Sequence, residues 1–211
     1  MLRPAKLIIF AALPAALLIL VLSYFFIDLP LIYWAASLSP QVAKVANAIV
    51  WWFSPYVFMV AWPLIFFFYT FILEKSTFRN ELLFIVIAVP AAVLAGDIIK
   101  DLVGRSRPEL LFQEGIYGFL PLSRAETYRS FPSGHSCAIC SVMAALSCFR
   151  PKWSWLFFLI ALALSFFRVL GLAHYFSDIW GAIIITFCLV YSLYLPYQRK
   201  SIWKNISRTK S

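Results

Sequence analysis

Six long runs of apolar residues constrain the fold of this chain more than any other feature. They cover residues 7–27, 50–73, 82–99, 135–149, 153–172 and 178–196. Most approach the length of about 20 residues that a helix needs to cross a bilayer. The composition agrees, because 63% of the residues are hydrophobic and 13% are charged, whereas a soluble domain is about half apolar and a quarter charged. We predict an all-α integral membrane protein with six transmembrane helices, folded as one domain over residues 1–211.

The segments between these runs predict the remaining elements. Residues 29–49 mix apolar and polar side chains, which predicts a short amphipathic helix after the first span. The stretch 100–134 is the longest polar one, and its Gly, Pro and Tyr content predicts an ordered connection over the outer face, between spans three and four. Residues 74–81 and 150–152 are expected to be short charged turns. Residues 197–211 form a basic tail, which we expect in the cytoplasm.

The positive charge of the chain separates into two groups. The formal net charge is +9, which is also compatible with nucleic-acid binding. The positive-inside rule explains more of it, because eleven of the 18 Lys and Arg residues fall in the N-terminus, the two short turns and the tail. We therefore expect cytoplasmic termini and no nucleic-acid partner. The other seven fall on the opposite side, where the rule predicts depletion: Lys44, Lys100, Arg105, Arg107, Arg124, Arg129 and Arg168. An anionic ligand accounts for this local excess.

Three polar clusters reach the same outer surface if the chain crosses the membrane six times. The first, KDLVGRSRP, begins at Lys100, where the third span ends. The second, SFPSGHS, ends where the fourth span begins, and contains His135. The third, RVLGLAHYFSD, lies between spans five and six and contains His174, the other of the two histidines. Ionisable groups next to membrane spans are costly and indicate a functional site.

The first two clusters suit an oxyanion. Arg107 presents forked donors that match phosphate oxygens, and Lys100 adds a compact charge. The free N–H groups at the start of a helix bind anions, and Gly134 would let an oxyanion approach the backbone there. Ser133 offers a hydroxyl, and His135 an acid or base in the first turn. Taken alone, each cluster is also compatible with lipid-headgroup contact or an ordinary capped helix.

The third cluster offers a nucleophile. If residues 168–178 are helical, His174 and Asp178 lie four residues apart on one face. A carboxylate on one imidazole nitrogen fixes the tautomer and leaves the other free to attack or to bind a metal. The sequence has no HExxH motif, and the CxxC pair Cys137/Cys140 has no second pair, so we expect helix packing for these thiols and no metal or other cofactor. Lys, Arg and backbone donors would then have to neutralise the phosphoryl charge.

In order and spacing, the clusters resemble the three-part signature of the type 2 phosphatidic acid phosphatase (PAP2) superfamily, in its membrane lipid phosphate phosphatase branch. The matching residues are Lys100-x6-Arg107-Pro108, Pro132-Ser133-Gly134-His135 and Ser165-x2-Arg168-x5-His174-x3-Asp178. One departure is that the family often has Ser directly before the third-motif Arg. Phe167 stands there in this chain, which puts a role for Ser165 in doubt.

The resemblance implies a six-helix fold, a site at the outer membrane face and metal-free hydrolysis. It implies that His174 is the nucleophile that forms a phosphohistidine and that Asp178 orients it. His135 is implied to protonate the leaving oxygen and then to activate water. The remaining groups of the signature would hold the phosphoryl oxygens: Lys100, Arg107, Ser133, the Gly134 amide and Arg168.

Arg105, Arg124 and Arg129 lie outside the signature. We expect them either to contact a lipid headgroup or second phosphate, or to face anionic lipid. We favour anionic lipid for the group, and Arg129 is the first candidate for a headgroup contact.

The motifs describe the phosphoryl site rather than the lipid, and they carry no signal for an oligomeric state. Membrane lipids with a phosphomonoester or pyrophosphate are the expected substrates: undecaprenyl pyrophosphate, which we favour slightly, phosphatidylglycerophosphate or lipid A. The bilayer of a bacterial inner membrane is the expected location. A lipid phosphotransferase is the close alternative, since a phosphohistidine can pass its phosphoryl group to another lipid. A non-catalytic lipid-binding or transport protein is less favoured, because the charges gather at one surface. The membrane composition also argues against a vanadate haloperoxidase with the same phosphate cradle.

Overall fold

The computed structural model describes residues 4–72 and 78–208, with side chains for 12–72 and 78–198, and its elements in that part are helices joined by loops. An isolated bridge pairs Arg105 with Phe119. The helices are α1 (Pro4–Leu22), α2 (Asp28–Ser37), α3 (Pro40–Trp51), α4 (Pro55–Phe67), α5 (Arg79–Val103), α6 (Pro108–Glu114), α7 (Gly134–Phe149), α8 (Ser154–Leu170) and α9 (Phe176–Arg208). A π-helical turn, Ser23–Ile27, joins α1 to α2, and a second, Phe68–Ile72, extends α4. The prediction of an all-helical fold is confirmed for the described residues.

Five segments are long and apolar enough to cross a membrane: Ala12–Ser37, Pro40–Ile72, Arg79–Val103, Pro151–Leu170 and Phe176–Gln198. They overlap five of the six predicted spans. The first continues past its predicted end because α2 follows α1 without a break, and the helix predicted within 29–49 is α3, which leads into α4. The remaining predicted span, 135–149, corresponds to α7, whose 16 residues are fewer than a bilayer usually needs. The six-span topology therefore stays a prediction.

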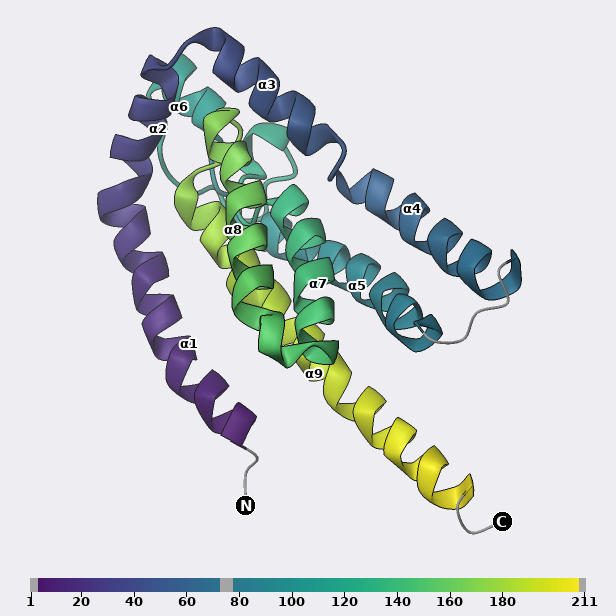
Figure 1. Cartoon of the computed structure of the whole chain (residues 1–211). Coiled ribbons are helices and arrows are strands. Elements are labelled where there is room, and N and C mark those ends of the chain that lie inside the picture. The colour runs from purple at the N-terminus through teal and green to yellow at the C-terminus, as the bar shows by residue number, and fades with distance from the viewer. Residues whose placement is uncertain (1–3, 73–77, 209–211) are drawn as a thin grey trace.

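Helix α7 lies at the centre of the bundle, where it packs most extensively against α5, α8 and α9 (Figure 1). Its composition explains this place, because small side chains allow close helix packing. Cys137, Ala138, Cys140 and Ala145 are fully buried, and both cysteines are free thiols. The expectation that these thiols serve packing agrees with their burial.

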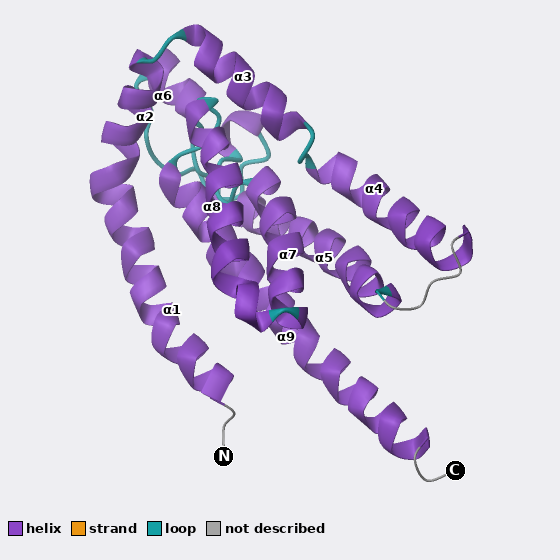
Figure 2. Ribbon diagram, in the orientation of Figure 1, coloured by secondary structure: helices purple, strands orange, loops and turns teal. Residues whose placement is uncertain are grey.

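The ends of the helices fall into two groups. The start of α1 and the end of α9 lie at one end of the bundle (Figure 1). Helix α6 and the loops around it gather at the opposite end, as the teal segments of Figure 2 show. This arrangement agrees with the predicted topology, in which both termini lie on one side and the polar connection on the other.

The connection between α5 and α7 is ordered, as predicted. Gly104 ends α5 in the left-handed conformation, with φ of +60°, which a side chain would strain. The Leu120 N–H donates to the Gly104 carbonyl at 2.6 Å, and the Ser130 N–H to the Arg105 carbonyl at 3.0 Å. These bonds return the chain past the end of α5 before it enters α7.

One predicted boundary differs from the structure. Helix α9 continues to Arg208, past the predicted end of the last span at residue 196, so most of the basic tail is helical. Residues 73–77, within the turn predicted at 74–81, and residues 209–211 of the tail lie outside the described residues.

Candidate functional site

The signature residues meet where four helices end or begin. Lys100 lies in the last turn of α5, and His135 in the first turn of α7. Arg168 lies in the last turn of α8, and Asp178 in the first turn of α9. Residues that are far apart in the sequence therefore converge at the end of the bundle that carries the connection between α5 and α7.

Lys100 and the start of α7 are in direct contact. A Cβ added to Gly134 would lie 2.8 Å from Lys100 Nζ, so only glycine lets the ammonium group come this close to the helix start. Lys100 Nζ also lies 3.2 Å from Asp97 Oδ1. Ser133 caps α7, since its Oγ accepts from the Ser136 N–H at 3.4 Å. A cation and the free N–H groups of a helix start thus face the same space, as an anion site requires.

Arg107 and Arg168 hold few partners. Arg107 Nη2 donates to Glu126 Oε2 at 3.2 Å, and Arg168 Nη1 to Asn47 Oδ1 at 3.3 Å. The Nε atoms of both are buried, with no hydrogen-bond partner in the described part of the chain. The charges of Arg168, Lys100 and Arg107 all act on His135. Buried donors without partners are rare, and here they surround a histidine at a helix start.

The segment around His174 is not the continuous helix that the i, i+4 spacing assumes. Helix α8 ends at Leu170, α9 begins at Phe176, and residues 171–175 form a turn with Leu172 at a φ of +54°. The condition of a continuous helix is therefore not met, but the two side chains still meet. His174 Nδ1 lies 3.5 Å from Asp178 Oδ2, because the turn folds back over the start of α9.

The Asp178 carboxylate is held from several sides. Its Oδ2 accepts from Ser130 Oγ at 2.6 Å and from the Tyr175 N–H at 2.9 Å. Ser130 Oγ also lies 3.5 Å from His174 Nδ1. Asp178 is fully buried and His174 is 2% exposed. The carboxylate is therefore fixed beside one ring nitrogen of His174, which leaves Nε2 as the nitrogen that can attack.

The pKa of His174 is lowered to about 3, mainly by burial, and the hydrogen bond that its ring donates to Asp178 raises it less than that. The charges of Arg168 and Arg107 lower this pKa further. His174 is consequently neutral at pH 7 in the unliganded protein, which is the protonation state that a nucleophile needs.

Arg105 corrects a prediction. We expected it to face anionic lipid or a headgroup, but it is only 2% exposed. Its Nη1 lies 2.5 Å from Asp178 Oδ1 and its Nη2 lies 2.6 Å from Asp28 Oδ2. The expectation was wrong because the connection folds inward at Arg105 and places the guanidinium between two buried carboxylates.

The other two candidates for headgroup contact differ from each other. Arg129 forms ion pairs with Asp97, Asp101 and Glu126, so it links the carboxylates that partner Lys100 and Arg107. Arg124 is exposed, and its contact with a headgroup or with anionic lipid stays a prediction. Ser165 is buried near Cys140 Sγ, away from the cluster, which agrees with the doubt about its role.

The sequence reasoning missed three residues. Asp28 carried one signal, as an acid at the end of the first apolar run. Ser130 belongs to the second motif string but lies before its Pro-Ser-Gly turn. Asn47 lies on α3, where it accepts from Arg168 and donates to the Gly171 carbonyl at 3.1 Å. In the described residues, no three His, Cys, Asp or Glu side chains gather as a metal site requires, so the absence of a metal stays a prediction.

With this geometry established, the chain was compared with known proteins. The model of the PAP2 superfamily matches residues 80–202, which include every signature residue. The chain belongs to the PAP2 superfamily. Two lipid A 1-phosphatases, from Rhizobium johnstonii and Rhizobium etli, are each 35% identical to it over 86 residues. That match covers 41% of this chain and 35% and 37% of the two relatives, so the chain spans well under half of their length in this match. No solved structure matches the chain.

Proposed function

We propose that this protein hydrolyses a phosphomonoester or pyrophosphate on a membrane lipid through a phosphohistidine at His174. The observation that carries the proposal is that Arg107 and Arg168 lie beside a neutral His174 with only one hydrogen bond from each side chain. A phosphoryl group offers these donors charged oxygens with a matching geometry. Family membership supports the same chemistry.

The reaction follows from the positions of these residues. Lys100, Arg107 and Arg168 hold the phosphoryl oxygens, and Ser133 and the Gly134 amide add neutral donors. The lone pair of His174 Nε2 attacks phosphorus, while Asp178 holds the Nδ1 proton. The bond from phosphorus to the lipid oxygen breaks, and His135, which takes up a proton once the bound phosphoryl anion offsets the nearby cations, protonates that oxygen. Water, deprotonated by His135, then displaces His174 and releases phosphate. Together these donors stabilise, by electrostatic attraction, the negative charge that grows on the phosphoryl oxygens in the transition state.

Two carboxylates already pair with cations that would hold the phosphoryl group. Lys100 pairs with Asp97, and Arg107 with Glu126. Asp97 and Glu126 are 48% and 78% exposed, so both ion pairs are weak. A phosphoryl group can therefore displace the two carboxylates at small cost, while Arg129 retains them.

The relatives favour one substrate class. Since both are lipid A 1-phosphatases, a lipid A type phosphate becomes the first candidate, ahead of undecaprenyl pyrophosphate and phosphatidylglycerophosphate. The proposed location is a bacterial inner membrane, with cytoplasmic termini and the site at the extracytoplasmic face.

A phosphate-release panel tests the proposal. Purified protein in lipid-detergent micelles is given each of the three lipids, without added metal and with a chelator present. We expect release from at least one lipid, and no release with His174→Ala, because the nucleophile is gone. Strict dependence on metal, or near-normal activity of His174→Ala, would overturn the mechanism.

The same panel separates the alternatives. A phosphotransferase would release phosphate only slowly without an acceptor lipid and would label that lipid when it is supplied. A non-catalytic lipid-binding or transport protein would release none in either case. The stability of the phosphoryl label on the protein identifies the intermediate, because a phosphohistidine survives base and is lost in acid.

A further inference from the structure

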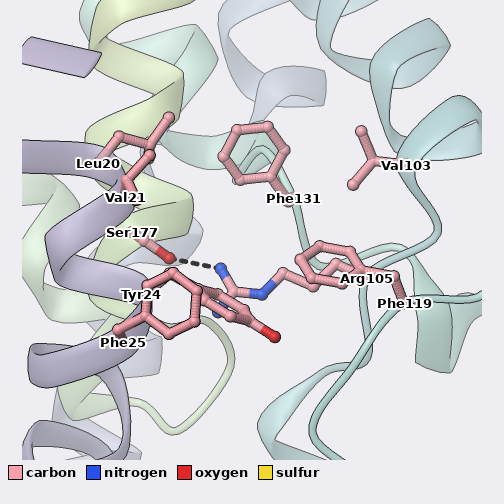
Figure 3. A pocket seen from close by; sticks show the side chains of 9 residues that line it. All are labelled: Leu20, Val21, Tyr24, Phe25, Val103, Arg105, Phe119, Phe131 and Ser177. Carbon is pink, nitrogen blue, oxygen red and sulfur yellow. Dashed lines mark hydrogen bonds between the residues drawn. The ribbon is translucent and has the colours of Figure 1, made fainter. Parts of the chain in front are cut away.

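Arg105 is the centre of a buried network that has no role in the reaction described above. Its four Nη hydrogens are directed at Asp178 Oδ1, Ser177 Oγ, Asp28 Oδ2 and the Tyr117 hydroxyl, at 2.5, 2.5, 2.6 and 3.1 Å. Figure 3 shows the bond to Ser177 and the rings of Tyr24 and Phe119 beside the guanidinium. Arg105 thus connects the carboxylate behind the nucleophile to an aspartate on the first span.

Apart from these four hydrogen-bond partners, the surroundings of Arg105 are aromatic and apolar. Its guanidinium carbon lies 4.6 to 5.9 Å from the ring centroids of Tyr24, Tyr117, Phe119 and Tyr175. On one side it borders an apolar cavity of about 210 Å³ between α1 and the end of α5 (Figure 3). Charges act on each other more strongly in such an environment than in water.

Asp28 is bound as tightly as Asp178. It is fully buried, and Ser177 donates to it twice, from its N–H to Oδ1 at 2.8 Å and from its hydroxyl to Oδ2 at 2.5 Å. Ser177, which holds Asp28, directly precedes Asp178 in α9. The two aspartates are therefore linked to adjacent positions of this helix. Burying a second carboxylate costs free energy, and packing alone gives no reason for it.

The charge of the network gives a reason. Arg105 alone would neutralise Asp178, which would then do little for a positive charge on His174. With Asp28 present, one cation is shared by two carboxylates, and the buried network keeps one negative charge. When His174 Nε2 bonds to phosphorus, its ring still carries the Nδ1 proton and becomes positively charged. It returns to neutral when water breaks the bond from Nε2 to phosphorus.

We propose that Asp28 is a positioning residue that neutralises Arg105, so that Asp178 keeps its negative charge for the imidazolium that forms on His174. Arg105 supplies the fixed fork that holds both carboxylates at once. This role rests on the proposed phosphohistidine mechanism and extends it to the first span, which lies outside the segment that the family model matches.

The test is a charge-restoring pair of variants, with pre-steady-state phosphate release on the lipid that the panel identifies. Asp28→Asn keeps the shape but neutralises the network, and we expect kcat to fall about 10- to 100-fold with KM little changed. The burst amplitude counts the active sites, so a partly misfolded preparation lowers the amplitude and not the rate constant.

The double variant Asp28→Asn/Arg105→Met decides the cause. It removes one charge of each sign and returns the negative charge to Asp178, so we expect its rate constant to exceed that of Asp28→Asn about tenfold, as a coupled pair allows. Asp28→Glu should rescue most of the rate. Tyr117→Phe, which removes a bond to Arg105 but no charge, is the matched control with a small effect.

Three results would overturn the inference: a rate constant of Asp28→Asn close to wild type, an equal fall in Tyr117→Phe, or a double variant as slow as the single one. If Asp28→Asn does not fold, the double variant alone carries the test. A rate constant within about tenfold of wild type supports the role, and a loss beyond about 100-fold contradicts it. An active His174→Ala would instead remove the proposed function itself.

Discussion

The site holds two kinds of arginine that carry the same charge in opposite settings. The side chains of Arg107 and Arg168 each donate one hydrogen bond, at 3.2 and 3.3 Å, to an exposed partner. Arg105 directs both terminal nitrogens at buried carboxylates, at 2.5 and 2.6 Å. Under the proposed function the first two would bind an anionic substrate, whereas Arg105 already pairs with two carboxylates.

The difference shows what each arginine can contribute. Free energy is gained on substrate binding only by donors that have no strong partner beforehand. A guanidinium whose two terminal nitrogens are both paired instead fixes the groups around it, here the Asp178 carboxylate beside His174. The four predictions below test this division.

The largest effect is expected on stability. Arg105→Met leaves Asp28 and Asp178 buried without their cation, so we expect a loss of about 3–5 kcal/mol in the free energy of unfolding. Arg168→Met is the matched control and should change that free energy little, because Arg168 holds only one neutral partner. Denaturant unfolding in a defined micelle measures both. Equal losses would erase the distinction between the two settings.

Substitution of an arginine that has few partners should instead impair catalysis. Removing one oxyanion donor typically costs about 100- to 1000-fold in rate, and we expect a loss of that size in kcat for Arg168→Met and for Arg107→Met. Lysine at either position should recover only part of it, because an ammonium cannot donate in a fork. Phosphate release from the identified lipid measures the loss. A loss below tenfold in both methionine variants would mean that these arginines do not bind the phosphoryl group.

The loosely held residues were predictable from the sequence, and the buried network was not. Lys100, Arg107, Ser133, His135, Arg168, His174 and Asp178 stand at spacings that predict a phosphoryl site, and the structure brings them together. These residues lie in three short motifs with characteristic internal spacing, so their pattern is visible in the sequence. The all-helical fold was equally visible in the lengths of the apolar runs.

Asp28 and Arg105 escaped prediction because their meaning lies in a contact across 77 residues. An acid after an apolar run and an arginine in a polar connection both resemble ordinary interface residues. The turn at 171–175 was missed for a related reason, since a spacing of four suits a helix and a tight turn equally. Local patterns thus gave the reacting groups, while the tertiary fold alone shows what holds them.

His174 lies between the two arginine settings, and its titration reports mainly its burial. Its pKa is about 3 in the folded protein, against about 6.5 when unfolded. Between these values the unfolded chain binds the extra proton, so this contribution to stability is complete above pH 6.5 and falls as the pH drops toward 3. From pH 7 to pH 5 the loss is about 2 kcal/mol. His174→Gln should show a flatter dependence of unfolding on pH, and an identical dependence would contradict the lowered pKa.

The smallest effect concerns Asn47, which joins α3 to the phosphoryl site through Arg168 and the Gly171 carbonyl. Both bonds are exposed, so each contributes only about 1 kcal/mol, and Asn47→Ala should lower kcat/KM about fivefold through a less fixed Arg168. Asn47→Asp is the sharper variant. It supplies Arg168 with a carboxylate of its own and moves this arginine toward the setting of Arg105. If a strong partner prevents an arginine from binding substrate, the aspartate must raise KM more than the alanine does, although it preserves a hydrogen bond that the alanine loses. The opposite order would show that anchoring, rather than freedom from a counterion, makes Arg168 effective.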